Sequence, residues 1–253
     1  MSELVRVEDR AALRILTLNR PDKRNALSTE LMTLLHAELG RAIDDPSVRS
    51  IAITGAGPGF CAGLDLHEVQ ASRSDPKMAQ RGSDILYDLL DRAYRSPKPV
   101  IAAVNGSAVA GGAGLMSVCD LVIAAESARI GYPEVKRGLI AAIVMTYLVR
   151  QVGERRAKFL LLTGELFDAT EARQMGLINE VVPDRELMSR VEYWGEQFAA
   201  CPPEALALTK SILYEIQALS PDESIRRARK VHTQMRRADS AGQAIQKFLG
   251  GKS

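Results

Sequence analysis

Residues 98–118 read KPVIAAVNGSAVAGGAGLMSV, and this stretch decides the class of fold. Residues 99–104 form an apolar run rich in β-branched side chains, which is typical of a buried strand. Asn105 and Gly106 then form a dipeptide that favours a turn. Residues 110–118 are all small or apolar and predict the start of a buried helix. Because residues 121–124 form another apolar strand, the order strand, turn, helix, strand indicates an α/β protein.

The N-terminal region shows the same alternation of strand and helix signals. Residues 13–18 and 51–54 are short apolar runs with β-branched side chains, so each predicts a strand. Between them, Ser28 stands where a helix N-cap is expected, and leucines recur after it at helical spacing. A glycine-rich loop at residues 55–60 follows the second strand. The α/β pattern therefore extends over the whole first half of the chain.

From about residue 140 the pattern becomes mainly helical. Residues 141–151 are apolar enough that we expect them to be buried, and residues 221–249 predict one or two polar helices. The composition changes near residue 200, where two prolines follow a cysteine. We therefore divide the chain into an α/β core over residues 1–200 and a helical C-terminal subdomain over residues 201–253.

The composition is that of an ordinary globular protein. The chain has 253 residues and a net charge of +2, from 33 basic and 31 acidic side chains, which gives no electrostatic case for nucleic-acid binding. No apolar run is long enough to span a membrane, and the N-terminus lacks the apolar stretch of a signal peptide. Cys61, Cys119 and Cys201 are widely spaced, so we expect free thiols in the cytoplasm. There is no Cys-x-x-Cys pair, and we expect no metal.

Two glycine clusters, at residues 55–63 and 111–114, raise the question of a nucleotide site. Neither has the spacing of a dinucleotide-binding loop, and neither contains the Gly-Lys-Ser/Thr of a phosphate loop. Each cluster instead ends where a helix can start, around Leu64 and at Gly111. Helix N-termini offer unpaired amide N–H groups and the positive end of the helix dipole. Two such ends facing each other would form a pair of donors for a developing oxyanion.

An ordered series of further motifs runs along residues 10–215. The segments are NRPDKRNAL at 19–27, GFCAGLDL at 59–66, KPVIAAVNG at 98–106 with Gly111-Gly112 and Cys119-Asp120, IGYPEV at 130–135, and TGE at 163–165 with GLINEVV at 176–182. Each segment is weak alone, but their order along one chain is specific. Together they resemble the crotonase superfamily, the enoyl-CoA hydratase/isomerase group.

The resemblance implies a spiral of ββα units with a C-terminal helical subdomain, assembled as a homotrimer or a dimer of trimers. It implies an acyl-CoA thioester as the substrate and no separate cofactor, because coenzyme A is part of that substrate. By their positions in the motifs, the backbone N–H groups of Leu64 and Gly111 would form an oxyanion hole around the thioester carbonyl. The residues that would receive coenzyme A are Lys23, Arg24, Ala26, Ala62, Asp65 and Leu66.

Two departures from the usual family pattern bear on the mechanism. Family hydratases of the common type use two glutamates, whereas this chain has Gly114 at the first position and only Glu134 at the second. One carboxyl can still take a proton from water and pass it to the α-carbon, so Glu134 is the predicted acid/base. Residues 141–145, AAIVM, replace the usual PGAGG and should reshape the acyl pocket. These features resemble most closely the methylglutaconyl-CoA hydratase-like branch.

We expect the acyl pocket to contain Gly114, Tyr132, Ile143 and Met145. For Tyr132 and Met145, and also for Phe248, packing in the core is the alternative interpretation. The pocket would then owe its shape to bulky apolar side chains rather than to the glycines that are usual in the family.

The predicted activity is hydration of the 2,3 double bond of a short or branched enoyl-CoA, with Glu134 as the single acid/base. A Δ3–Δ2 enoyl-CoA isomerase is one alternative, because one glutamate can also move a proton between two carbons. A non-catalytic acyl-CoA-binding protein is another, because one glutamate of the usual pair is missing. Asp65 and Glu68 are further acidic candidates, although Asp65 also fits a helix cap. We expect the basic stretch 226–237 to be a solvated helix face or a subunit contact.

Overall fold

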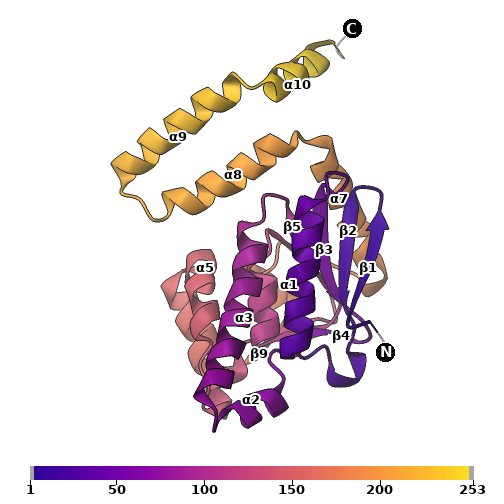
Figure 1. Ribbon diagram of the computed structural model, residues 1–253, viewed down its shortest axis with the longest axis vertical. Coiled ribbons are helices and arrows are strands. Elements are labelled where there is room, and N and C mark those ends of the chain that lie inside the picture. The colour runs from indigo at the N-terminus through magenta and orange to yellow at the C-terminus, as the bar shows by residue number, and fades with distance from the viewer. Residues whose placement is uncertain (1–2, 251–253) are drawn as a thin grey trace.

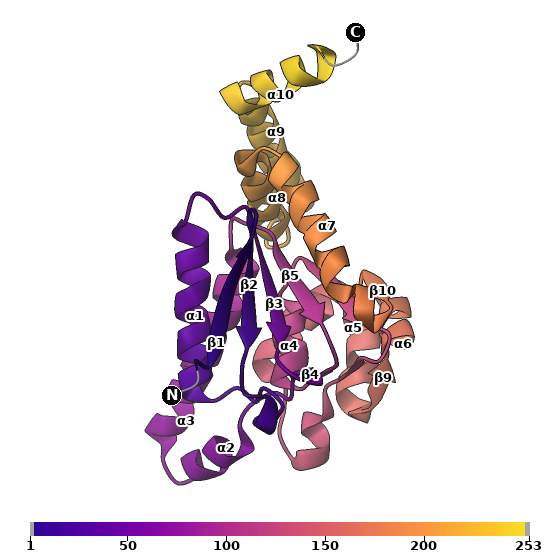
Figure 2. The same ribbon diagram turned by 90° about the vertical axis from the view of Figure 1, so that its right-hand side faces the viewer.

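The computed structural model describes residues 3–250, which form two β-sheets covered by helices, with a helical arm at one end (Figure 1, Figure 2). The strands of the larger sheet are, in spatial order, β1 (Val5–Arg10), β2 (Leu13–Leu18), β3 (Ser50–Gly55), β5 (Val100–Val104), β7 (Leu121–Ala125) and β10 (Glu180–Val182). Those of the smaller sheet are β4 (Gly59–Cys61), β6 (Ser107–Val109), β8 (Arg129–Gly131) and β9 (Leu166–Asp168).

Three successive strand pairs, β3–β4, β5–β6 and β7–β8, each contribute one strand to each sheet, and this makes the chain a spiral. Strands β3, β5 and β7 are parallel neighbours in the larger sheet, while the strands that follow them, β4, β6 and β8, are parallel neighbours in the smaller one. Helices follow the strand pairs, so each turn of the spiral is a ββα unit. Parallel strands need such crossovers, because a tight hairpin joins only antiparallel neighbours. The predicted ββα spiral is confirmed.

Helices cover both faces of the larger sheet. The helices of residues 3–250 are α1 (Thr29–Asp44), α2 (Leu66–Ser72), α3 (Pro76–Arg95), α4 (Gly111–Ser117), α5 (Ala142–Thr163), α6 (Ala169–Gln174), α7 (Leu187–Ala200), α8 (Pro203–Ile216), α9 (Pro221–Arg236) and α10 (Asp239–Gly250), with 3-10 turns η1 (Pro21–Lys23), η2 (Pro133–Arg137) and η3 (Asp184–Glu186). Along β5, Ile101 and Ala103 pack under α7, whereas their neighbours face the main core beneath α1, α3 and α4. This alternation follows from the two-residue period of a strand.

Most of the predicted elements are confirmed. The strands expected at 13–18, 51–54, 99–104 and 121–124 are β2, β3, β5 and β7, and every residue of α4 is buried, as expected for 110–118. The burial expected for residues 141–151 is only half right, because α5 lies on the outside of the core and presents one face to it. Leu148 is buried there, whereas Val149 is 40% exposed.

The last three helices form an arm that extends away from the body of the molecule (Figure 1). Helix α8 is tied to the core by Lys210, whose Nζ donates to Asp120 Oδ2 at 2.5 Å and to the Lys98 carbonyl at 3.1 Å. The polar helices predicted over 221–249 are present as α9 and α10. Within residues 3–250, no helix combines the length and the apolar character that crossing a membrane requires. The domain boundary at residue 200 stays a prediction.

Candidate active site

A cavity of about 630 Å³ is lined in part by α2. This helix lies at the end of the molecule opposite the C-terminal arm (Figure 1). The wall of the cavity is formed by the segment around η1, the first turns of α1 and α4, parts of α2 and α3, and the segment from η2 into α5. These elements come from distant parts of the chain. The cavity is therefore a product of the spiral, which brings the ends of several ββα units together.

Two backbone amides lie side by side in the cavity wall, those of Leu64 and Gly111. A Cβ on Gly111 would lie only 3.5 Å from the Leu64 nitrogen. Leu64 and Leu27 form an isolated parallel bridge. In it the Leu27 amide donates to the Gly63 carbonyl at 2.8 Å, and the Asp65 amide donates to the Leu27 carbonyl at 3.0 Å. This pairing uses the neighbours of Leu64 and leaves its own N–H free, while Gly111 is the first residue of α4. Neither N–H donates a hydrogen bond to any residue of the described chain.

The glycines of the two clusters allow this close approach. Gly63 has a φ of +90°, and a Cβ there would lie 2.9 Å from the Gly111 nitrogen. A Cβ on Gly112 would lie 2.2 Å from the Cys61 carbonyl oxygen. Ala110, the residue before α4, also has a positive φ of 53°, which is unusual for a residue with a side chain. Glycines in both clusters let the backbones around Leu64 and Gly111 approach this closely. Gly111 begins α4 as predicted, whereas Leu64 lies two residues before the start of α2.

Glu134 lies in η2, and its side chain lines the cavity. Its Oε2 atom is buried and has no hydrogen-bond partner among residues 3–250. Burial raises the pKa of this carboxyl, while the Glu134 backbone amide and the charge of Arg137 act in the opposite direction. A carboxyl with a free oxygen and a raised pKa in a cavity is a candidate general acid/base.

Two contacts hold the turn that carries Glu134 against helix α4. The Ala110 amide donates to the Gly131 carbonyl at 2.9 Å. The Tyr132 hydroxyl lies 2.6 Å from the Ser117 hydroxyl, in a fully buried position. Ser117 gives its only hydroxyl hydrogen to a carbonyl one turn earlier in α4, so Tyr132 is the donor to Ser117. The segment that carries the candidate acid/base is thus joined by two hydrogen bonds to the helix that starts at the candidate oxyanion donor.

The six residues predicted to receive coenzyme A all line the cavity. Two of them, Lys23 and Arg24, are exposed, so their charges are accessible to phosphate groups. Arg20, which the motif contains but for which no role was predicted, joins the two loops of this region. Its guanidinium donates to the Ala26 carbonyl at 2.6 Å and to Asp65 Oδ2 at 3.0 Å.

The other two acidic candidates are already engaged. Asp65 pairs with Arg20 and accepts the His67 amide at 3.1 Å, so it caps α2 as the sequence suggests. Burial acts to raise the pKa of Asp65, but the hydrogen bonds outweigh it and the pKa is lowered. Glu68 Oε2 accepts both the amide and the hydroxyl of Thr29 at 2.8 Å. Glu134 is therefore the carboxyl best suited to exchange a proton with a ligand.

The prediction for the acyl pocket needs correction. Of its four residues, Ile143 lies on the cavity wall, and the other three lie behind it. Gly114 is covered by Val144, because a Cβ on Gly114 would lie 2.4 Å from Val144 Cγ2. The Tyr132 side chain turns inward toward α4, and Met145 is half-buried in α5, next to Val144 but off the wall. Core packing, the alternative interpretation for Tyr132, is the correct one.

The sequence did not predict the side chains of α1 and α3 that line the cavity. Met32 of α1 and Leu86 and Met78 of α3 line the cavity, and their only signal is the apolar repeat of the two helices. That repeat also marks ordinary core residues, so it could not single them out. Phe248 lies on α10 and is 66% exposed, so it belongs neither to the core nor to this cavity.

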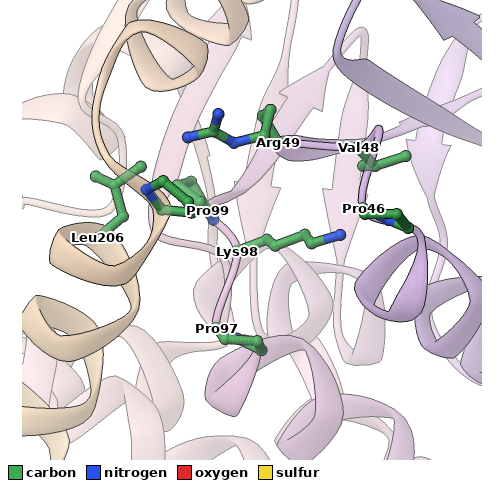
Figure 3. A pocket seen from close by; sticks show the side chains of 8 residues that line it. Pro46, Val48, Arg49, Pro97, Lys98, Pro99 and Leu206 are labelled. Carbon is green, nitrogen blue, oxygen red and sulfur yellow. The ribbon is translucent and has the colours of Figure 1, made fainter. Parts of the chain in front are cut away.

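A second, smaller hollow of about 270 Å³ lies between the core and α8 (Figure 3). Its two basic side chains are engaged with backbone carbonyls. Lys98 Nζ donates to the Ala42 and Asp45 carbonyls at 2.8 and 2.5 Å, and Arg49 donates to the Cys201 carbonyl at 2.5 Å. Because Lys98 and Arg49 are engaged in these bonds, we assign both side chains a structural role. Across residues 3–250, no group of three or more His, Cys, Asp or Glu side chains could hold a metal ion.

Comparisons with known proteins identify the family. The family described as enoyl-CoA hydratase/isomerase matches residues 8–252. A protein of Thermus thermophilus is 39% identical over 97% of both chains, and the 2,3-dehydroadipyl-CoA hydratase of Escherichia coli is 34% identical over 98% of this chain and 96% of its own. The crystal structure of an enoyl-CoA hydratase from Mycobacterium smegmatis has a TM-score of 0.93 at 31% identity, covering 99% of this chain and 97% of that one. The chain belongs to the enoyl-CoA hydratase/isomerase family of the crotonase superfamily.

Proposed function

We propose that this enzyme adds water across the 2,3 double bond of a short or branched enoyl-CoA. The observation that carries the proposal is that Glu134 lines the same cavity as Leu64 and Gly111, while its Oε2 and their N–H groups have no hydrogen-bond partner among residues 3–250. Lys23 and Arg24 supply positive charge at the same cavity for the phosphates of coenzyme A. The chemistry needs a proton acceptor and an anion-stabilising pair of donors, and the cavity offers both.

In this mechanism the N–H groups of Leu64 and Gly111 bind the thioester oxygen. Glu134 takes a proton from water as the water oxygen bonds to C3, and the π electrons of the double bond move toward the thioester oxygen. The two N–H groups stabilise the negative charge there, and losing one such donor costs about 3 kcal/mol in the transition state. Glu134 then delivers the proton to C2, which restores its carboxylate and leaves a 3-hydroxyacyl-CoA.

The same residues also suit a Δ3–Δ2 isomerase, and a specific observation favours keeping it as a second candidate. Gly114 lies behind Val144, so the position of the usual first glutamate contributes no group to the chamber. A double-bond shift needs a single carboxyl, which would remove a proton from C2 and return it to C4. We do not retain the non-catalytic binding protein, because the family to which the chain belongs is one of enzymes.

The test is a panel of 2-enoyl-CoA and 3-enoyl-CoA thioesters offered to the wild type and to Glu134→Gln. Loss of the absorbance of the conjugated thioester from the 2-enoyl esters identifies a hydratase, and its appearance from the 3-enoyl esters identifies an isomerase. Glu134→Gln should lose turnover by at least about 100-fold, since a positioned acid/base contributes 10²- to 10⁴-fold, and should keep acyl-CoA binding.

A matched control uses Glu154, an exposed carboxylate of α5 that pairs with Lys158 outside the cavity. Glu154→Gln should retain wild-type turnover. Activity of Glu134→Gln within a few-fold of the wild type would contradict the assignment of the acid/base. Saturable acyl-CoA binding by the wild type without either absorbance change would contradict the proposed reaction.

We also propose that the enzyme is a homotrimer or a dimer of trimers. The support is the arm, where Leu213, Ile225 and Ile245 are each more than half exposed, which is a large apolar surface for a helical extension. Light scattering of the full chain should give three or six times the 27.6 kDa of one chain; a monomeric mass would contradict the proposal. The cytoplasmic location and the methylglutaconyl-CoA hydratase-like branch stay predictions.

A further inference from the structure

The cavity is lined by a third Lys or Arg residue besides Lys23 and Arg24. Arg137 also lines it, but it comes from η2, three residues after Glu134. Lys23 and Arg24 belong instead to the segment at η1, which provides the residues assigned to coenzyme A. The positive charges of the cavity are therefore on two separate segments, one of which carries the acid/base.

The geometry of η2 places Arg137 on the same side as Glu134. In a 3-10 helix the side chains of residues i and i+3 eclipse each other, and three residues rise by about 6 Å. Since the Glu134 side chain faces the cavity, Arg137 should project in the same direction, and both residues line the wall. The guanidinium is also close enough for its charge to lower the pKa of Glu134.

Arg137 takes part in no ion pair or side-chain hydrogen bond with the described residues, 3–250. Its neighbour Lys136 differs, because Lys136 Nζ is paired with Glu165 Oε1 at 2.6 Å. The wall next to Arg137 is apolar, formed by Leu139, Ile140 and the start of α5. Arg137 is exposed, so its guanidinium is accessible to an anionic group that a ligand in the cavity brings.

We propose that Arg137 binds a carboxylate at the far end of the acyl chain, so that the substrates are thioesters of short unsaturated dicarboxylic acids. The proposal rests on the proposed function, which places the thioester carbonyl at Leu64 and Gly111. The acyl chain would then pass Glu134 and end a few carbons beyond the double bond, near the guanidinium. Arginine suits this task because its planar fork can donate two parallel hydrogen bonds to a carboxylate.

The test compares two 2-enoyl-CoA esters of equal chain length, six carbons, of which one ends in a carboxylate and the other in a methyl group. The wild type should prefer the carboxylate ester in kcat/KM by at least about tenfold, which is the effect of one charged hydrogen bond. Arg137→Gln should abolish most of this preference, mainly through KM, and Arg137→Lys should keep part of it. Lys136→Gln is the matched control and should leave the preference unchanged, because Lys136 pairs with Glu165.

Equilibrium binding of the saturated six-carbon esters distinguishes failure of the Arg137 proposal from failure of the proposed hydration reaction. A wild type that hydrates the methyl ester at least as well as the carboxylate ester would overturn the role of Arg137 and leave the hydratase intact. A wild type that turns over neither ester, but binds the saturated carboxylate ester more tightly than Arg137→Gln does, would overturn the reaction and support the binding role. Equal binding by the wild type and Arg137→Gln would overturn the binding role in either case.

Discussion

Gly114 offers the sharpest test of how the active-site wall is packed. It lies in the middle of α4, where alanine should be the better residue, since glycine costs a helix interior about 0.8–1.0 kcal/mol relative to alanine. A Cβ at this position, however, would lie 2.4 Å from Val144 Cγ2 and 3.4 Å from Val144 Cγ1. Val144 is a buried, β-branched residue with restricted rotamers, so it cannot simply turn away.

The two effects have opposite signs, and their sizes decide the outcome. Overpacking a buried site costs about 1–3 kcal/mol, which exceeds the gain in helix propensity. We therefore expect Gly114→Ala to lower the free energy of unfolding by about 1 kcal/mol, with a melting temperature about 2–4 °C lower for a chain of this size. In a Val144→Ala background the two Cγ atoms of Val144 are absent. Gly114→Ala should then raise the free energy of unfolding by up to about 1 kcal/mol.

The assay is a double-mutant cycle by denaturant unfolding of the wild type, the two single variants and the double variant. The double variant should be more stable than the sum of the two single effects predicts, by a coupling free energy of about 1–3 kcal/mol. Additive effects, or a Gly114→Ala protein more stable than the wild type, would refute the reasoning. The same geometry implies that a glutamate introduced at position 114 could not reach the chamber while Val144 remains.

Two further predictions concern the carboxyl and its support. Burial raises the pKa of Glu134 above its ordinary value of 4.5, so the folded protein binds this proton more tightly than the unfolded chain, and ionisation destabilises the fold as pH rises through the raised value. Glu134→Gln should therefore be more stable than the wild type at neutral pH, with the difference vanishing below pH 4.5, as measured by denaturant unfolding across pH; an equal difference at all pH values would contradict it. Tyr132→Phe removes the bond to Ser117 and should cost about 0.5–1.5 kcal/mol of stability. The variant should also lower kcat more than it changes KM, and wild-type kinetics would show that this bond does not position Glu134.

The strongest sequence predictions were those based on periodicity and on backbone requirements. The buried strand and helix at 98–118 became β5 and α4, because an apolar run of that length and composition has few alternatives. The glycine clusters were informative for a similar reason. Positive φ at Gly63 and the contact of Gly112 with the Cys61 carbonyl exclude other residues, so the requirement is visible in the sequence.

The acyl pocket could not be predicted in the same way. A position in a motif does not say whether a side chain points into a cavity or behind its wall. Tyr132, two residues before Glu134, turns to Ser117, while Glu134 itself faces the cavity. Met32 and Leu86 reach the wall from α1 and α3, and nothing local distinguishes them from the core residues beside them.

The sequence by itself determined the family, because an ordered series of motifs depends only on residue type and spacing. The ββα spiral and the prediction of Leu64, Gly111 and Glu134 as site residues followed from that resemblance. The tertiary structure decided which acidic groups are free. Asp65 and Glu68 are held by Arg20 and Thr29, whereas Glu134 Oε2 has no partner among residues 3–250. The tertiary structure also placed Gly114 behind Val144, so position 114 contributes no group to the chamber. Both outcomes depend on contacts between segments far apart in the chain, and only the folded packing brings those segments together.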